Sequence, residues 1–434
     1  MVERKEYLER LIQWKDEQVI KVVTGIRRCG KSTLLLQYQE WLKASGVSDE
    51  QIVTINFEEL EYEELQDYKK LYAYLKDRLC KGKMTYIFLD EIQKVSAFEK
   101  VVDSLYVKPQ VDLYVTGSNA YMLSGDLATL LTGRYVEIKM LPLSFREFLA
   151  FHDFEVRETQ SALGGLRKQV FDKNGERYEL REVFDAYMRF GGMPGIADVG
   201  LEQEKTLSLF DGIYSTVVIR DILEREKHRG QKQITDPALL RKIILFLADN
   251  IGSSVSIASI GNTLVNEGLL DDEKRKGAPS AHTVQAYVNA LLESYFFYEI
   301  KRFDIKGKAY LRTLGKYYIV DIGLRNYLLG LRNRDSGHAI ENVVYFELLR
   351  RGYDAAIGKS GNAEVDFIAT SADEKKYIQV TESMMNEDVR KRELAPLQSI
   401  RDNYEKIVLS LEPGLDASYD GIKSENLIEW LLGE

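Results

Sequence analysis

Residues 22–36 read VVTGIRRCGKSTLLL, and this stretch decides the fold. Within it Gly25, Gly30, Lys31 and Ser32 have the spacing G-x-x-x-x-G-K-S, which is the pattern of a phosphate-binding loop. In such a loop the glycines let backbone N–H groups surround phosphate oxygens, the lysine reaches the β- and γ-phosphates, and the serine hydroxyl holds Mg²⁺. The stretch therefore predicts a nucleoside triphosphate site.

The residues on either side of the loop fit the same interpretation. Val19, Ile20, Val22 and Val23 predict a short buried strand before the loop, and residues 31–43 predict a helix whose amino end faces the phosphates. An ordinary glycine-containing turn before a helix is the alternative. The other residues expected to line the nucleotide are those within and just after the loop, namely Ile26, Arg27, Arg28, Cys29 and Thr33.

A second chemical signature follows at residues 86–91, which read YIFLDE. This is an apolar strand that ends in two carboxylates, the arrangement known as Walker B. Asp90 would hold Mg²⁺ through its water shell, and Glu91 would polarise the attacking water. A strand that merely ends in an acidic turn is the alternative, but behind a phosphate loop the pair favours nucleotide chemistry.

The next predicted strand, residues 112–116, runs into Gly117, Ser118 and Asn119. A polar side chain here could hydrogen-bond the γ-phosphate or the attacking water, although turn chemistry alone would also explain these residues. Because open α/β sheets bind ligands at the carboxyl ends of their strands, the phosphate loop, the two carboxylates and this pair are expected to converge.

Arg134 lies between a predicted helix and an alternating strand at residues 135–140. It could reach a γ-phosphate. An exposed arginine paired with a carboxylate explains the same spacing equally well.

Composition sets outer limits on the function. The chain has 434 residues, 45% apolar and 29% charged, which predicts a globular protein of about two to four domains. Its 59 basic and 68 acidic residues give a net charge of −9, so the chain lacks the basic field of a protein made only to coat nucleic acid. A local basic face remains open.

The amino-terminal sequence and the cysteines bear on the compartment. The start, MVERKEYLERLIQWKDE, is charged and helical in pattern, unlike a secretory signal, and no apolar run approaches the ~18 residues of a membrane span. With only Cys29 and Cys80, neither a disulfide framework nor a zinc site is expected. We therefore expect a cytoplasmic protein without a membrane partner. Cys29 is either a redox switch on nucleotide binding or a small residue that fills the loop.

Four segments together resemble a known family: VVTGIRRCGKSTLL, YIFLDEIQKV, VTGSNAYMLSGDLATLLTGRYVEIKMLPLSFREFL and FGGMPG. They resemble the prokaryotic predicted ATPases of the AAA superfamily that carry a C-terminal domain of unknown function. The resemblance implies ATP and Mg²⁺ as cofactors. It also implies a P-loop sheet with the sensor strand between the loop strand and the Walker B strand, and an arginine finger at Arg134. Pro194, in GGMPG, would contact the nucleotide from a helical lid; from the residues alone this is a tight loop between helices.

The middle of the chain predicts helices and then a smaller module. Residues 181–249 have a helical pattern that suits a lid. Two short helices, at 256–264 and 280–292, precede strands at 295–300 and 317–320. This order predicts a winged helix, which the family resemblance also supports. Its basic residues are Lys301, Arg302, Lys306 and Lys308, so it is either a DNA contact or a packing module.

The last hundred or so residues resemble a restriction-endonuclease-like fold. Glu341 lies on a predicted helix, Asp366 on a hairpin strand, and a further strand follows at 377–381. Gln379 and Thr381 stand where that fold's second acid and lysine should be, so a metal ligand and the cation that orients the water are both absent there. We expect a structural or recognition remnant, although Glu341 and Asp366 could still bind a cation weakly.

Together these patterns predict an α/β protein with a P-loop NTPase parallel sheet. The expected division is an ATPase core at 1–150, a helical lid at 151–249, a winged-helix-like module at 250–335 and a nuclease-like domain at 336–434. The expected function is hydrolysis of ATP with Mg²⁺ as a switch or motor coupled to the later modules. The alternative is an ATP-regulated nucleic-acid-binding protein or nuclease, which the missing acid and lysine disfavour. A homo-oligomer and an unidentified protein partner both remain open.

Overall fold

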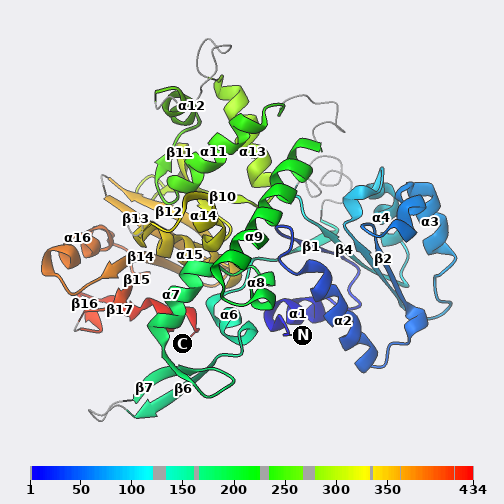
Figure 1. Ribbon diagram of the computed structural model, residues 1–434, viewed down its shortest axis with the longest axis horizontal. Coiled ribbons are helices and arrows are strands. Elements are labelled where there is room, and N and C mark those ends of the chain that lie inside the picture. The colour runs from blue at the N-terminus through cyan, green and yellow to red at the C-terminus, as the bar shows by residue number, and fades with distance from the viewer. Residues whose placement is uncertain are drawn as a thin grey trace. The chain divides into compact units, whose positions relative to one another are not determined.

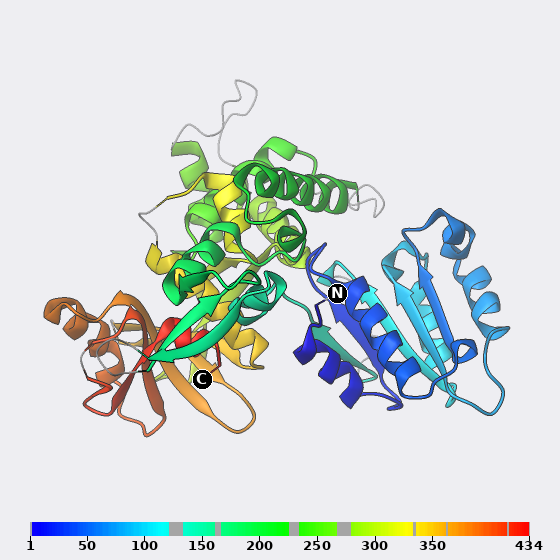
Figure 2. The ribbon, with the colours of Figure 1, turned by 60° about the horizontal axis from the view of Figure 1, so that its bottom comes forward.

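A computed structural model describes residues 2–120, 133–160, 166–224, 234–266, 279–332, 336–361, 363–414 and 416–433. The chain divides into two compact units, which Figures 1 and 2 show from two directions. The first comprises Met1–Leu141 with Glu293–Tyr295, and the second comprises Pro142–Leu292 with Phe296–Glu434.

The first unit is built on a parallel sheet of five strands in the order β2-β3-β4-β1-β5. The strands are β1 (Ile20–Thr24), β2 (Ile52–Asn56), β3 (Thr85–Asp90), β4 (Val111–Gly117) and β5 (Tyr135–Lys139). Strand β4 lies between the loop strand β1 and the Walker B strand β3. The predicted α/β fold class and its P-loop strand order are therefore confirmed.

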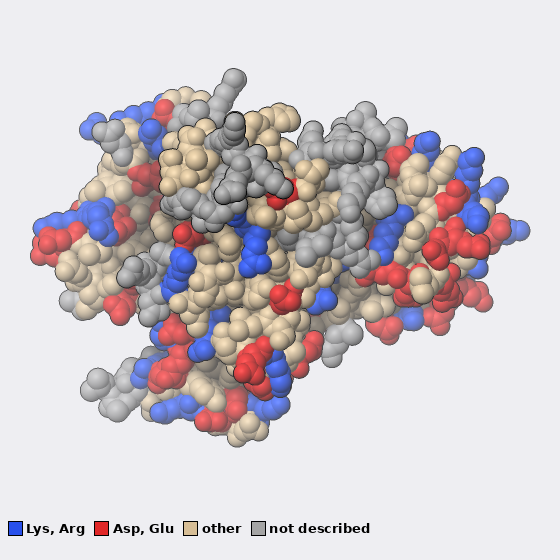
Figure 3. All heavy atoms as spheres, turned by 45° about the horizontal axis from the view of Figure 1, so that its top comes forward, with Lys and Arg blue, Asp and Glu red and all other residues tan. Residues whose placement is uncertain are grey.

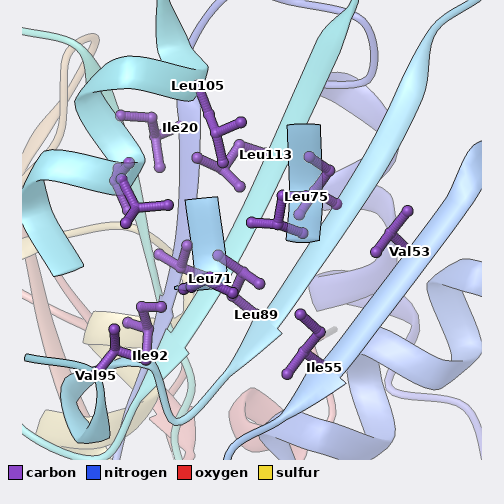
Figure 4. Packing of buried hydrophobic residues seen from close by; sticks show 14 of the residues in the cluster. Ile20, Val53, Ile55, Leu71, Leu75, Leu89, Ile92, Val95, Leu105 and Leu113 are labelled. Carbon is purple, nitrogen blue, oxygen red and sulfur yellow. The ribbon is translucent and has the colours of Figure 1, made fainter. Parts of the chain in front are cut away.

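Helices and apolar side chains cover this sheet. The helices are α1 (Lys5–Gln13), α2 (Lys31–Ala44), α3 (Tyr68–Lys76) and α4 (Phe98–Tyr106), with shorter helical turns at Asp49–Gln51, Leu60–Gln66 and Ile92–Lys94. Figure 4 shows part of the core, in which Leu71 and Leu75 of α3 and Leu105 of α4 pack with strand residues such as Ile55 and Leu113. Every residue of β1, β3 and β4 is buried, as continuous apolar strands of a covered parallel sheet require.

The second unit contains a nine-stranded mixed sheet in the order β16-β17-β15-β14-β13-β12-β10-β11-β9. The strands are β9 (Ser254–Val255), β10 (Phe297–Asp304), β11 (Ala309–Ile319), β12 (Asp354–Ser360), β13 (Ala363–Thr370), β14 (Lys375–Ser383), β15 (Glu405–Glu412), β16 (Ser418–Tyr419) and β17 (Ile422–Asn426). The helices are α6 (Phe145–Phe151), α7 (Leu180–Phe190), α8 (Gly195–Val199), α9 (Gln203–Tyr214), which continues as a wider helical segment at Ser215–Glu224, α11 (Pro237–Asp249), α12 (Ile257–Asn266), α13 (Ala281–Glu293), α14 (Ile322–Leu329), α15 (Ser336–Arg350), α16 (Glu387–Gln398) and α17 (Leu427–Leu431).

The predicted winged-helix elements are present, but their hairpin has an additional partner. Helices α12 and α13 and the antiparallel pair β10–β11 occur in the expected order. Strand β10 also pairs in parallel with β12, with Arg302 opposite Ile357. The hairpin expected to be a wing is thus part of the same sheet as the nuclease-like strands.

The segment expected to be a helical lid also differs in its first part. Residues 155–179 contain the strands β6 (Glu155–Gln160), β7 (Leu166–Phe171) and β8 (Arg177–Glu179), which form a separate three-stranded antiparallel sheet. Val156 pairs with Val170, and Val170 with Tyr178, so one apolar row crosses the three strands. After these strands the next helix, α7, begins at Leu180, which agrees with the helical pattern predicted for residues 181–249.

Among the described residues, no helix has the length and apolar character needed to cross a bilayer. Figure 3 shows acidic and basic side chains interspersed over the face that it draws.

Candidate nucleotide-binding site

The phosphate loop lies between β1 and α2, and two of its glycines are required by the backbone. Gly25 has a φ of 144°, and a Cβ there would overlap the carbonyl oxygen of Met140. Gly30, with a φ of 100°, precedes the first residue of α2. Both conformations are ones that residues with side chains rarely adopt, so the loop can close tightly only because glycine stands at both positions.

Lys31 points into this loop. Its Nζ donates to the carbonyl oxygens of Gly25 at 3.0 Å and Ile26 at 3.2 Å, and it lies 3.8 Å from Oε1 of Glu91. The side chain is only 4% exposed. The ammonium group is thus positioned at the loop by backbone acceptors that a phosphate could replace.

Asp90 joins the loop to the neighbouring strands. Burial raises the pKa of its carboxyl group, while hydrogen bonds with the Ser32 and Thr116 hydroxyls work in the opposite direction. Thr116 Oγ1 donates directly to Asp90 Oδ1. Ser32 at the start of α2 and Asp90 at the end of β3, the two residues predicted as metal ligands, are therefore in hydrogen-bond contact.

Glu91 has an unusual backbone conformation and a well-defined carboxylate position. Its φ is 53°, and its N–H donates to Thr116 Oγ1 at 2.9 Å. The carboxylate Oε2 accepts from Ser118 Oγ at 3.1 Å and from the Gln93 amide. A left-handed conformation is costly for a residue with a side chain, so its occurrence at the predicted catalytic carboxylate is notable for function.

The remaining predicted residues of the site have distinct environments. Asn119 is buried after β4, next to Ser118. Arg27 pairs with Glu58. Arg28 is exposed with a φ of 64°, while Ile26 is buried and Thr33 half-buried.

Cys29 is fully buried, and burial raises the pKa of its thiol, which favours the loop-filling interpretation over a reactive thiolate.

Three contributors were not predicted from the sequence: Thr116, Arg4 and Gln93, whose amide donates to the Glu91 carboxylate. Thr116 contacts both Walker B residues, as described above. Arg4 donates to the carbonyl oxygens of Cys29 at 3.2 Å and Leu141 at 3.0 Å, so the amino-terminal segment stabilises the backbone of the phosphate loop. The position of Thr116, opposite Asp90 on the adjacent strand, could have been found by extending the strand register. No local pattern indicates Arg4.

Arg134 lies away from this cluster. Its carbonyl accepts from the N–H of Ile20, so the residue is at the amino-terminal edge of the sheet, opposite the loop. Its guanidinium pairs with Asp103 at 2.6 Å, and the two side chains are 43% and 40% exposed. The five residues of β5 separate it from the loop edge by roughly 16 Å. Arg134 therefore cannot act on the nucleotide of its own chain in this conformation. Residues 121–132 of the segment before it lie outside the described residues.

Pro194 belongs to the second unit, where it precedes α8. The glycines before it are closely packed. The Gly192 N–H donates to the buried Asp321 at 2.6 Å, and the Gly192 carbonyl accepts from the Leu143 N–H at 2.6 Å. A Cβ on Gly191 or Gly192 would overlap these neighbours. This packing explains the tight loop, and contact of Pro194 with nucleotide stays a prediction.

The nuclease-like residues meet around a lysine that the sequence pattern did not locate. Glu341 on α15 and Asp366 on β13 both lie near Lys316 on β11, at 2.9 and 3.9 Å from its Nζ. Gln379 is hydrogen-bonded to Glu393 through its amide at 3.1 Å. The expectation that no lysine cation is present at this site is wrong, because the cation comes from a different strand.

Comparison with known proteins places the chain in a family. The model of an AAA domain matches residues 17–149, and a domain of unknown function (DUF8612) matches residues 181–335. An uncharacterized protein of Haemophilus influenzae is 38% identical over 435 residues, covering 100% of this chain and 99% of that protein. One of Methanocaldococcus jannaschii is 29% identical over 405 residues, covering 91% and 79%.

Solved structures give more distant matches. A Walker-type ATPase of Pyrococcus abyssi matches with a TM-score of 0.46 and 15% identity, over 76% of this chain and 96% of that one. The ORC1 protein of Aeropyrum pernix, solved in complex with DNA, has a TM-score of 0.30 and 13% identity, over 76% and 92%. These two likenesses are too distant to support a functional argument. The relative from Haemophilus influenzae and the matched AAA domain show that the chain belongs to the prokaryotic AAA-type ATPases that carry a domain of unknown function after the AAA domain.

Proposed function

We propose that the chain binds ATP with Mg²⁺ at the phosphate loop and hydrolyses it to ADP and phosphate. The observation that carries this proposal is the convergence of Lys31, Ser32, Asp90 and Glu91 at one edge of the parallel sheet. The alternative, an ordinary glycine-containing turn before a helix, does not explain why a lysine, a hydroxyl and two carboxylates lie close together. The arrangement also matches the ligand-binding edge of open α/β sheets.

The residues present suit a magnesium nucleotide. The Ser32 hydroxyl and the Asp90 carboxylate supply oxygen ligands, which Mg²⁺ prefers. A magnesium ion held by so few protein ligands keeps several water molecules. When bound, the ion would neutralise negative charge on the β- and γ-phosphates. Thr116 would orient Asp90 through its hydroxyl hydrogen bond.

Each side chain then has a role in binding or in proton movement. Lys31 would exchange the carbonyls of Gly25 and Ile26 for phosphate oxygens, since its ammonium already lies within the loop. Glu91 would accept a proton from the attacking water. Ser118 and Gln93 both donate to Oε2, so these two residues would hold the carboxylate in place while the other oxygen, Oε1, accepts the proton.

Nucleotide state would be coupled to the second unit through residues 140–143. Within the first unit, the Met140 N–H donates to Thr24 at 2.7 Å, directly before the phosphate loop. Within the second, the Pro142 carbonyl accepts from Arg350 at 2.8 Å, and the Leu143 N–H donates to Gly192. A shift of the loop backbone on nucleotide binding would therefore act on residues 140–143, the short covalent connection whose two ends are hydrogen-bonded within the first and the second unit.

Lys31→Ala is expected to abolish ATP binding, because it removes the cation that offsets the charge of the triphosphate. Calorimetric titration with ATP and Mg²⁺ measures the effect. Lys43→Ala, at the far end of α2 and 42% exposed, is the matched control and should bind as the wild type does. Unchanged affinity of the Lys31 variant would refute the assignment of the loop.

Thr116→Val is expected to lower the rate of hydrolysis by about 10- to 100-fold, because Asp90 loses the hydroxyl that orients it. The defect should be smaller at high Mg²⁺ concentration, which distinguishes weakened metal binding from general damage. A magnesium titration of phosphate release is the measurement. A rate equal to that of the wild type at every concentration would show that Thr116 has no part in the site.

DNA contact is a separate part of the proposal. Lys301, Lys306 and Lys308 are exposed, whereas Arg302 is half-buried and 3.5 Å from Glu364. Binding through the three exposed lysines should weaken steeply as salt rises. A mobility-shift titration with duplex DNA at two salt concentrations, repeated with all three lysines changed to alanine, tests this part independently of ATP hydrolysis.

A further inference from the structure

Residues 293–295 belong to the first unit, although the chain on either side of them belongs to the second. They connect the end of α13 at Glu293 with the start of β10 at Phe297 (both elements are labelled in Figure 1). Ser294 and Tyr295 are buried. This 293–295 segment is therefore part of the compact unit that carries the phosphate loop, while both of its ends continue into the second unit.

Tyr295 has a backbone conformation that is unusual for a residue with a large side chain. Its φ is 57°, and the N–H of Phe296 donates to the carbonyl oxygen of Leu291 at 3.2 Å, which closes the end of α13. At this position after a helix the left-handed residue is most often glycine, because a side chain makes the conformation costly. The helix end alone therefore does not explain why a tyrosine stands here.

The Tyr295 side chain reaches a carboxylate beside the phosphate loop. Its hydroxyl donates to Glu137 Oε1 on β5 at 3.2 Å, and the same oxygen accepts from the Thr24 hydroxyl at 2.6 Å. The hydroxyls of Tyr295 and Thr24 are also in hydrogen-bond contact with each other. All three residues belong to the first unit. They thus form one hydrogen-bonded group that links the 293–295 segment to β1.

Thr24 is the last residue of β1, and Gly25, the first glycine of the phosphate loop, follows it directly. Thr24 is completely buried, and it pairs with Gly117 of β4 and Lys139 of β5. Its carbonyl oxygen accepts from the Met140 N–H, and a Cβ on Gly25 would overlap the Met140 carbonyl oxygen. Because so little space surrounds this strand end, a movement of the loop backbone also moves the Thr24 hydroxyl.

We propose that Tyr295 is a positioning residue whose hydroxyl couples nucleotide binding at the phosphate loop to the 293–295 segment. The coupling runs through Glu137 and Thr24. ATP favours the conformation in which the three side chains are bonded, and the segment carries this preference into α13 and the β10–β11 hairpin. The inference rests on the proposed binding of ATP, and it adds a second connection to the one at residues 140–143.

Thermodynamic linkage gives the sign and the size of the expected effect. If bound ATP stabilises the contact between Tyr295 and Glu137, the contact must strengthen ATP binding by the same factor. Tyr295→Phe keeps the buried ring and removes only the hydroxyl, so it should weaken ATP binding by at least about fivefold, the lower end of typical coupling factors. A tyrosine that only packs would tolerate this change without loss of affinity.

Calorimetric titration of the full chain with Mg²⁺ and β,γ-imido ATP, a non-hydrolysable analogue, measures the affinity. Glu137→Ala removes the other partner and should weaken binding to a similar extent, and the double variant should bind no more weakly than either single variant. Tyr310→Phe changes a tyrosine that is 58% exposed on β11, and this matched control should bind as the wild type does. Losses that add up in the double variant would contradict action through the contact.

Amide hydrogen exchange measures the other half of the coupling. In the wild type, saturating analogue should slow exchange in a peptide of residues 292–297 by at least about fivefold. The slowing should be lost in saturated Tyr295→Phe and kept in Tyr310→Phe. Should Tyr295→Phe fail to fold, Glu137→Ala provides the same comparison.

Two results of the exchange measurement would overturn the coupling while ATP binding stands. One is wild-type exchange that bound analogue does not change, and the other is slowing that persists in Tyr295→Phe. An analogue that does not bind the wild type in the calorimeter would instead refute the proposed function, and the coupling with it.

Discussion

Replacing Glu91 with glutamine is expected to lower ATP turnover by about 10²- to 10⁴-fold while leaving ATP binding intact. Glutamine keeps the shape of the side chain and can still bond with Ser118, but it cannot accept a proton from water as a carboxylate does. Phosphate release under saturating ATP measures the turnover. Equilibrium titration with ATP measures binding separately.

Glu40→Gln provides the matched control for this prediction. Glu40 is also a glutamate of the first unit, but its side chain is 76% exposed on α2 and forms only a surface pair with Lys43. Its substitution should leave both turnover and binding unchanged. Near wild-type phosphate release by Glu91→Gln would mean that another residue positions the water.

Arg134→Ala is expected to bind ATP normally and to hydrolyse it about 10³- to 10⁵-fold more slowly, if the guanidinium acts as an arginine finger. In the first unit this residue lies at the amino-terminal edge of the sheet, where it pairs with Asp103. It can therefore serve only the nucleotide of a neighbouring subunit. The prediction requires a homo-oligomer, and the rate should depend on protein concentration.

Mixing two inactive proteins separates this role from a surface role. Arg134→Ala combined with Lys31→Ala should recover part of the activity, because the empty site of the second protein still supplies the arginine. Arg78→Ala changes an exposed arginine two residues beyond the end of α3, and this control protein should be active alone. Unchanged turnover of Arg134→Ala would make the Asp103 contact an exposed ion pair worth about 0 to 1 kcal/mol. A defect that mixing never repairs would contradict action across subunits.

The sequence was most informative where chemistry and chain order are local. The phosphate loop needs Gly25 and Gly30 for backbone reasons, and those reasons are visible in the spacing alone. The strand order with β4 inside the sheet came from the family resemblance and is confirmed. The edge position of Arg134 follows from the register of β5 beside β1, which no motif encodes.

The sequence was least informative where distant strands meet. Lys316 lies on β11, a strand outside the expected nuclease pattern, and β11 joins the nuclease-like strands because its partner β10 pairs in parallel with β12 across the intervening helices α14 and α15. Such pairings are set by the whole sheet and not by neighbouring residues. Arg4 illustrates the same limit, since it reaches Cys29 and Leu141 from the start of the chain.

Steady-state phosphate release from ATP by the purified full chain, in Mg²⁺ and in EDTA, shows whether the phosphate loop and the Walker B carboxylate form a site of ATP hydrolysis. We expect release that requires Mg²⁺, is lost in Lys31→Ala together with ATP binding, and is lost in Glu91→Gln while ATP binding persists. Magnesium-dependent release that survives both substitutions in folded protein would contradict it, because the phosphate loop and the Walker B carboxylate would then not form the site of hydrolysis.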